Sequence, residues 1–118
     1  SLMLEKTEPL LSPEDVITLQ SDCEKVHVSE GLLDYIQALL RETRDDRWFE
    51  FGLSPRAGLA LLRGSRAHAF LEGRDFVMPE DVKAILPGLA RHRLSPSSGF
   101  AQSADEQIVE LLDQVPIP

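Results

Sequence analysis

The stretch SPRAGLALLRGSRAHAFLEG, residues 54–73, contains a start signal, an apolar body and a stop signal for one helix. Ser54 is suited to capping the first free amides, and Pro55 suits the first helical position, where no N–H is needed. Gly73 favours the left-handed turn that ends many helices. We expect a central helix over residues 55–72, because apolar residues cover nearly all of its sides. They are Leu59, Leu62, Ala69 and Phe70 on one side and Ala57, Leu61 and Leu71 on the other.

Arg56 does not fit the apolar character of this segment. A cation in the first turn of a helix meets the positive end of the helix dipole, which is locally unfavourable. Its presence indicates either an ordinary ion pair with an acid such as Glu50 or an anion supplied from outside the helix. The residues alone leave both interpretations open.

Two helices are predicted before this segment. The first covers residues 13–24, where Ser12 and Asp15 have the spacing of a capping box. The second begins at Ser29, ends near Arg44 and has one apolar stripe that predicts a buried face. The members of this stripe are Leu32, Ile36, Leu39, Leu40 and Thr43.

Two more helices are predicted after it. One starts at Pro79, with a bend or break near Pro87, because proline lacks the N–H that the helix needs. The last starts at Ser103, where Ser103 and Glu106 form another possible capping box. Its apolar positions are Ile108, Leu111, Leu112 and Val115. The expected fold is all-α, a single five-helix bundle with at most a very short strand pairing around Phe76.

Two segments lack a helical pattern. The stretch RDDRWFEFG, residues 44–52, is a charged loop that holds Trp48, Phe49 and Phe51, and we expect it to fold back onto the bundle. The stretch LSPSSGF, residues 94–100, is rich in proline, serine and glycine and predicts a linker or an exposed loop.

The charge of the chain is strongly acidic but unevenly distributed. Its 118 residues have a formal net charge of −8, which disfavours nucleic acid and anionic membranes as partners. Every arginine lies within residues 41–93, where nine arginines and Lys83 face eight acids, a net charge of +2. No apolar run approaches the roughly 20 residues that a membrane span needs. The single cysteine, Cys23, and the lack of a signal peptide favour a cytoplasmic protein.

The sequence contains no spacing of residues typical of a catalytic site or a metal site that this chain could form by itself. Cys23 and His27 are only two potential ligands, so we expect a half-buried thiol and a surface imidazole instead of a metal site. His68 and His92 are expected to be structural. The acids Glu80 and Asp81 suit the helix dipole in a first turn. No phosphate-binding loop G-x-x-x-x-G-K-[ST] is present.

Four stretches together resemble a known family. They are LQSDCEKVHVSEGLLDYIQALLRETR (19–44), GLSPRAGLALLRGSRAHAFLEGRDFVMPEDVKAI (52–85), RHRL (91–94) and VPIP (115–118). Their order and content resemble the C-terminal lid subdomain of MoxR-type AAA+ ATPases over residues 10–118. By this resemblance, residues 10–118 are the helical lid domain. Residues 1–9 are an N-terminal segment, interpreted as a cloning remnant followed by the linker from an absent ATPase core.

The resemblance also implies a function for Arg56, which matches the sensor 2 arginine of the S-P-R motif and is supported by Ser54 and Pro55. It implies a chaperone-like parent ATPase that holds ATP and Mg²⁺ in its P-loop core, whereas the fragment alone is no enzyme and binds no cofactor. The implied partners of the lid are its own core and a neighbouring protomer in a ring, expected to be a hexamer. The client protein is not implied.

Two positions depart from the family pattern. Leu53 replaces the small residue that often follows the glycine, and Met78 stands where Ser or Thr would cap the helix after it. Loss of that hydroxyl is expected to loosen the start of this helix. The alternative function from another class is a stand-alone helical module that binds a protein through its acidic surface or its aromatic loop.

Overall fold

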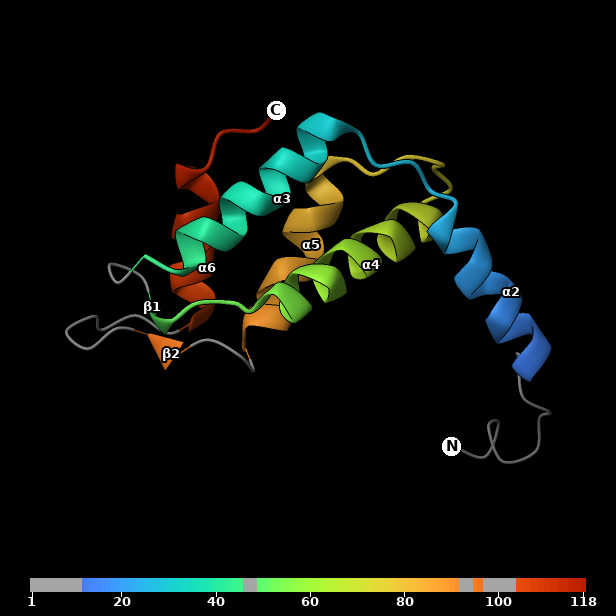
Figure 1. Ribbon diagram of the computed structural model, residues 1–118, viewed down its shortest axis with the longest axis horizontal. Helices are drawn as coiled ribbons and strands as arrows, with labels where there is room; N and C mark the ends of the chain where they lie inside the picture. Colours follow the sequence, from blue (N-terminus) through green and yellow to red (C-terminus); the bar gives the residue numbers. More distant parts are fainter. Residues whose placement is uncertain (1–11, 46–48, 92–94, 97–103) are drawn as a thin grey trace.

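The computed structural model describes residues 12–45, 49–91, 95–96 and 104–118 (Figure 1). Within these residues the elements, in chain order, are α2 (Pro13–Glu24), α3 (Glu30–Thr43), β1 (Phe49–Phe51), α4 (Pro55–Leu71), α5 (Pro79–Arg91), β2 (Ser95–Pro96) and α6 (Ala104–Gln114). The prediction of an all-α bundle with very little strand is therefore confirmed. No helix in the described ranges is both long and apolar enough to cross a membrane.

The position of α4 in the middle of the domain is also confirmed. This helix packs against α2, α3 and α5, while α6 packs against α5 and α3. Figure 1 shows α2 reaching away from one end of α4, with α3, α5 and α6 gathered at the other end. The side chains of Leu39, Leu61, Leu86 and Leu111 are fully buried and come from four different helices. Burial of each contributes roughly 2 to 3 kcal/mol.

Two glycines of α4 allow its neighbours to approach closely. A Cβ atom added at Gly58 would lie 2.7 Å from Leu40 Cδ1 of α3, and one added at Gly64 would lie 2.8 Å from Ile85 Cγ2 of α5. These distances are shorter than normal carbon contacts, which lie near 3.5 to 4.0 Å. The absence of a side chain at both positions therefore sets the spacing of three helices.

The predicted helix starts are confirmed where the structure describes them. Ser12 and Asp15 form the reciprocal capping box of α2, and the Ser29 and Ser54 side chains accept the cap hydrogen bonds of α3 and α4. Gly73 has a φ angle of +81°, which a residue with a Cβ rarely adopts. The proposed cap at Ser103 lies outside the described residues.

Other expectations are corrected. The helix α5 continues through Pro87, so of the bend or break predicted there the break does not occur. The buried Leu86 and Ala90 on either side of this proline hold the helix in the core. On α4, Leu59 is 56% exposed and Leu71 is 82% exposed. The helix is therefore covered on fewer sides than its apolar residues predicted.

Two short strand pairings are present among the described residues. His27 and Phe76 form an isolated parallel bridge, in agreement with the prediction around Phe76. A second pairing, which the sequence did not predict, joins β1 and β2 in antiparallel order. Part of the predicted charged loop is therefore a strand. Residues 46–48, including Trp48, lie outside the described residues.

Candidate functional site

The loop before α4 is fixed to the end of α3. The backbone N–H of Leu53 donates a hydrogen bond of 3.1 Å to Thr43 Oγ1, and the Thr43 hydroxyl donates one of 2.6 Å to the carbonyl of Leu40. Both Thr43 and Leu53 are buried. The departure at position 53 therefore adds a buried apolar side chain to the core.

This loop leads directly to Arg56 at the start of α4. The backbone N–H of Ala57 donates a hydrogen bond of 3.2 Å to Ser54 Oγ, and Pro55 occupies the first helical turn. Arg56 is exposed at this rigid helix start. Its guanidinium makes no hydrogen bond or ion pair with any residue in the described part of the chain. The arrangement offers an outward-facing forked donor whose backbone is held in place.

A second group of charges lies at the other end of α4, and the sequence did not predict it. The Asp81 side chain is fully buried. Arg74 donates to both of its carboxylate oxygens, at 2.5 and 2.7 Å, and His68 Nδ1 lies 2.6 Å from Oδ1. The backbone N–H of Met78 donates a bond of 2.7 Å to Oδ2. These residues form the Asp81 cluster, which ties α4, the following loop and α5 together.

The pKa of Asp81 follows from these contacts. Burial alone would raise the pKa of this carboxyl, because it removes water from the charged form. Hydrogen bonds from Arg74, Met78 and His68 outweigh this effect and lower the pKa from 3.8 to about 2. Asp81 is therefore a stable carboxylate, ionised at neutral pH, and its contacts are those of a structural group.

The Asp81 cluster adds to two expectations. Asp81 lies in the first turn of α5, as expected, and its side chain is in addition buried and bonded to Arg74 and to the Met78 backbone. At the start of α5 the Asp81 carboxylate accepts the Met78 N–H, and the Asp81 N–H donates to the Met78 carbonyl at 2.9 Å, where a Ser or Thr hydroxyl would otherwise accept. An acid three residues after the cap position was the usable signal for the first of these bonds. The looser helix start expected from the missing hydroxyl stays a prediction.

The sequence also offered the three histidines and Cys23 as candidate site residues. His68 is structural, as predicted, through its contact with Asp81. Cys23 is half-buried and the His27 side chain is exposed, which also agrees with expectation, whereas His92 lies outside the described residues. Within the described part of the chain, no three His, Cys, Asp or Glu side chains are grouped to hold a metal ion.

Comparisons with known proteins agree with this geometry. Residues 41–112 match the model of the AAA lid domain family. An uncharacterized Bacillus subtilis protein, YeaC, is 33% identical over 98% of this chain, and the Mycobacterium tuberculosis chaperone MoxR1 is 34% identical over 75% of it. A crystal structure of a protein from Cytophaga hutchinsonii proposed to be an ATPase has a TM-score of 0.84 and 29% identity over 94% of the chain.

The chain therefore belongs to the AAA lid domain family. Within this family, the chain is similar to MoxR proteins, which include chaperone MoxR1 and the protein MoxR of Methylorubrum extorquens, 36% identical over 62% of this chain. The chain spans only 37% of the Bacillus subtilis protein, 26% of chaperone MoxR1 and 37% of the Cytophaga hutchinsonii chain.

Proposed function

We propose that this chain closes over ATP held by a separate P-loop core and that Arg56 is the sensor 2 residue that contacts the nucleotide. The observation that carries the proposal is the state of Arg56. It is exposed at a capped and anchored helix start, and no acid among the described residues neutralises it. A cation placed at the positive end of a helix dipole is best stabilised by an anion from outside the domain.

The chemistry of a guanidinium suits this role. Its planar fork can pair with two oxygens of a terminal phosphate and can offset the charge that develops during phosphoryl transfer. Because Ser54 and Pro55 fix the start of α4, the position of Arg56 moves with the whole helix. A change at the phosphate is thereby coupled to the angle of the lid.

Other parts of the activity belong to the full-length protein. ATP and Mg²⁺ would be held by its core, since the present chain has no phosphate-binding loop. We infer that the lid contacts its own core and a neighbouring protomer in a ring, with a hexamer as the expected state. The name of chaperone MoxR1 supports a chaperone-like remodelling of client proteins. A cytoplasmic location stays the expectation drawn from the sequence.

The test is the Arg56→Ala substitution in the full-length ATPase. Loss of a donor that acts mainly in the transition state is expected to lower kcat by roughly a hundredfold to a thousandfold. Arg56→Lys is expected to recover only part of the activity, because lysine keeps the charge but loses the fork. Steady-state ATP hydrolysis measures both effects.

The matched control is Lys25→Ala, which removes one exposed positive charge directly after the last residue of α2. This variant is expected to hydrolyse ATP at nearly the parental rate. Parental hydrolysis by Arg56→Ala would refute the proposal.

A further inference from the structure

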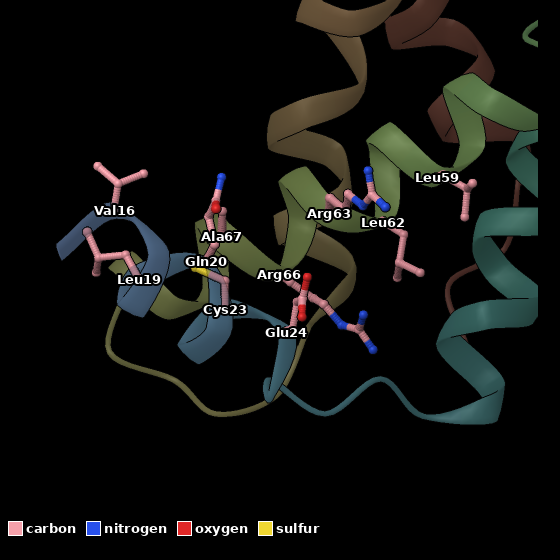
Figure 2. Close-up of a pocket in the computed structure, with 10 residues that line it drawn as sticks. All are labelled: Val16, Leu19, Gln20, Cys23, Glu24, Leu59, Leu62, Arg63, Arg66 and Ala67. Carbon is pink, nitrogen blue, oxygen red and sulfur yellow. The ribbon is translucent and has the colours of Figure 1, made fainter. Parts of the chain in front are cut away.

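A groove runs between α2 and α4 on the outer side of the domain. Its volume is about 870 Å³. Figure 2 shows Val16 and Leu19 on its α2 side and Leu59 and Leu62 on α4, with arginine side chains between the two apolar pairs in this view. Two helices form its walls, and no strand edge lines it.

The α2 wall of the groove is poorly covered. None of the 12 residues of α2 is buried, although the helix contains several apolar side chains. Val16 on α2 is 40% exposed, and Leu59 on α4, which lines the same groove, is 56% exposed. A helix that has apolar side chains but buries none of them gains little from packing on the domain alone. Another apolar surface is needed to complete its burial.

The groove continues onto α3. A second hollow of about 450 Å³ lies between α3 and α4 and shares Leu59 and Leu62 with the first. Leu33, also on its wall, is 37% exposed. Leu59 and Leu62 on α4 therefore border both hollows, and the two hollows together form one long apolar surface across α2, α4 and α3.

The charge of this surface is opposite to that of the chain. Among the described residues, Arg63 and Arg66 line the first hollow, Arg41 and Arg44 line the second, and Glu24 is the single acid in either lining. The net charge of these described linings is thus +3, whereas the whole chain has −8. Arg66 Nε donates a hydrogen bond of 3.2 Å to the Val26 carbonyl, which holds this guanidinium at the groove.

We propose that the groove between α2 and α4 binds an acidic amphipathic helix of a partner protein. A helix fits because both walls are helices, whose backbone groups are already paired, and because Val16 and Leu19, like Leu59 and Leu62, are spaced to meet side chains of a third helix. Acidic residues beside its apolar stripe would face Arg63 and Arg66. The inference is independent of the role of Arg56.

The first experiment titrates the 118-residue chain into a labelled probe and measures fluorescence anisotropy. The probe is a roughly 16-residue alanine-based helical peptide with leucine at every third or fourth position and glutamates only beside this leucine stripe, because like charges all around so short a helix would unfold it. The matched peptide has lysine in place of every glutamate. We expect saturable binding of the glutamate peptide and about tenfold weaker binding of the lysine peptide.

Two variants locate the binding surface. Leu59→Asp is expected to weaken binding of the glutamate peptide by about tenfold or more, because it places a carboxylate in the apolar centre of the groove. The matched control is Val109→Asp on α6, where the replaced side chain is equally exposed, at 57%, and lines neither hollow. Val109→Asp is expected to bind like the original chain.

The second variant tests charge without altering the apolar surface. Arg63→Glu is expected to weaken the glutamate peptide and to strengthen the lysine peptide, an exchange of preference that a damaged fold would not produce. Circular dichroism checks the helix content of each variant.

Several results would overturn the proposal. These are equal binding of the two peptides, equal effects of Leu59→Asp and Val109→Asp, and an unchanged preference in Arg63→Glu. Self-association of the chain that Leu59→Asp abolishes would assign the groove to a second copy. Binding by this chain but not by the full-length ATPase would assign it to the core of the same protein. Both assignments contradict an acidic partner helix.

Discussion

The two ends of α4 present charged side chains in opposite settings. At its C-terminal end, His68 contacts the buried Asp81, which also receives two bonds from Arg74. At its N-terminal end, Arg56 is exposed and makes no polar contact within the described residues. Near one end of this helix the charges of Asp81 and Arg74 are thus paired inside the domain, whereas the charge of Arg56 at the other end is exposed and without a partner among the described residues.

This difference separates a buried, paired charge from a solvated one. A buried carboxylate left without partners would cost several kcal/mol, so the Asp81 cluster is required for the fold. An exposed arginine is solvated by water and contributes little to the fold by itself. Substitutions at the two ends of α4 should therefore have unequal effects on stability, and the following tests measure that difference.

The largest effect is expected for Asp81→Ala. The substitution leaves the Met78 N–H without its acceptor and removes the charge that Arg74 and His68 contact, so the free energy of unfolding should fall by about 3 kcal/mol. Urea unfolding followed by circular dichroism measures this. Glu80→Ala, at the exposed neighbouring position, is the control and should change stability by no more than about 0.5 kcal/mol. Equal losses in the two variants would contradict a special role for Asp81.

A pH titration is expected to give the next largest effect. The folded pKa of Asp81 is about 2, below its ordinary value of 3.8, so the unfolded chain binds this proton first as the pH falls. The stabilisation is complete above about pH 5 and is lost progressively towards pH 2, by roughly 2 kcal/mol. The Asp81→Asn variant should lack this component. Parallel pH profiles for the two chains would argue against the assigned pKa.

Loss of the cap at the other end of α4 is expected to have a smaller effect. Ser54→Ala removes the acceptor of the Ala57 N–H and should destabilise the domain by about 1 kcal/mol. Thermal unfolding of the two chains compares them. In the full-length ATPase the same variant should lower hydrolysis less than Arg56→Ala does, because the arginine itself is retained. A larger loss of activity in Ser54→Ala would assign the main role to the cap.

The smallest effect on stability is expected for Arg56→Ala. No cavity forms and no partner is lost within the described residues, so the free energy of unfolding should change by no more than about 0.5 kcal/mol. Denaturant unfolding measures it under the same conditions as for Asp81→Ala. A loss comparable to that of Asp81→Ala would show that Arg56 is a structural residue and would remove the contrast between the two ends.

The helices were predictable because their signals are local. The start of α2 was predicted to the residue, since Ser12, Pro13 and Asp15 act within one turn of the helix they start. The buried face of α6 was predicted from spacing, and Ile108, Leu111 and Val115 are all buried. The place of Arg56 in a first turn left an ion pair and an outside anion both open, and its choice as a candidate rested on the family resemblance.

What was not predictable depends on contacts between distant segments. The pairing of β1 with β2 joins residues more than 40 positions apart, and no local pattern specifies it. The burial of Asp81 depends on how α4 and α5 meet, whereas its place in a first turn is equally typical of a surface residue. Leu71 was expected inside because it is apolar, but no neighbouring element covers it. The sensor role of Arg56 stays a prediction.

The poor covering of α2 has a consequence for how the domain opens. A helix that buries none of its residues can detach in a local fluctuation without disturbing the core. Its amide protons should then exchange with deuterium at a free-energy cost well below that of global unfolding, while the amide of the fully buried Leu61 exchanges only when the whole domain opens. The outer segment and the central helix thus belong to different cooperative units.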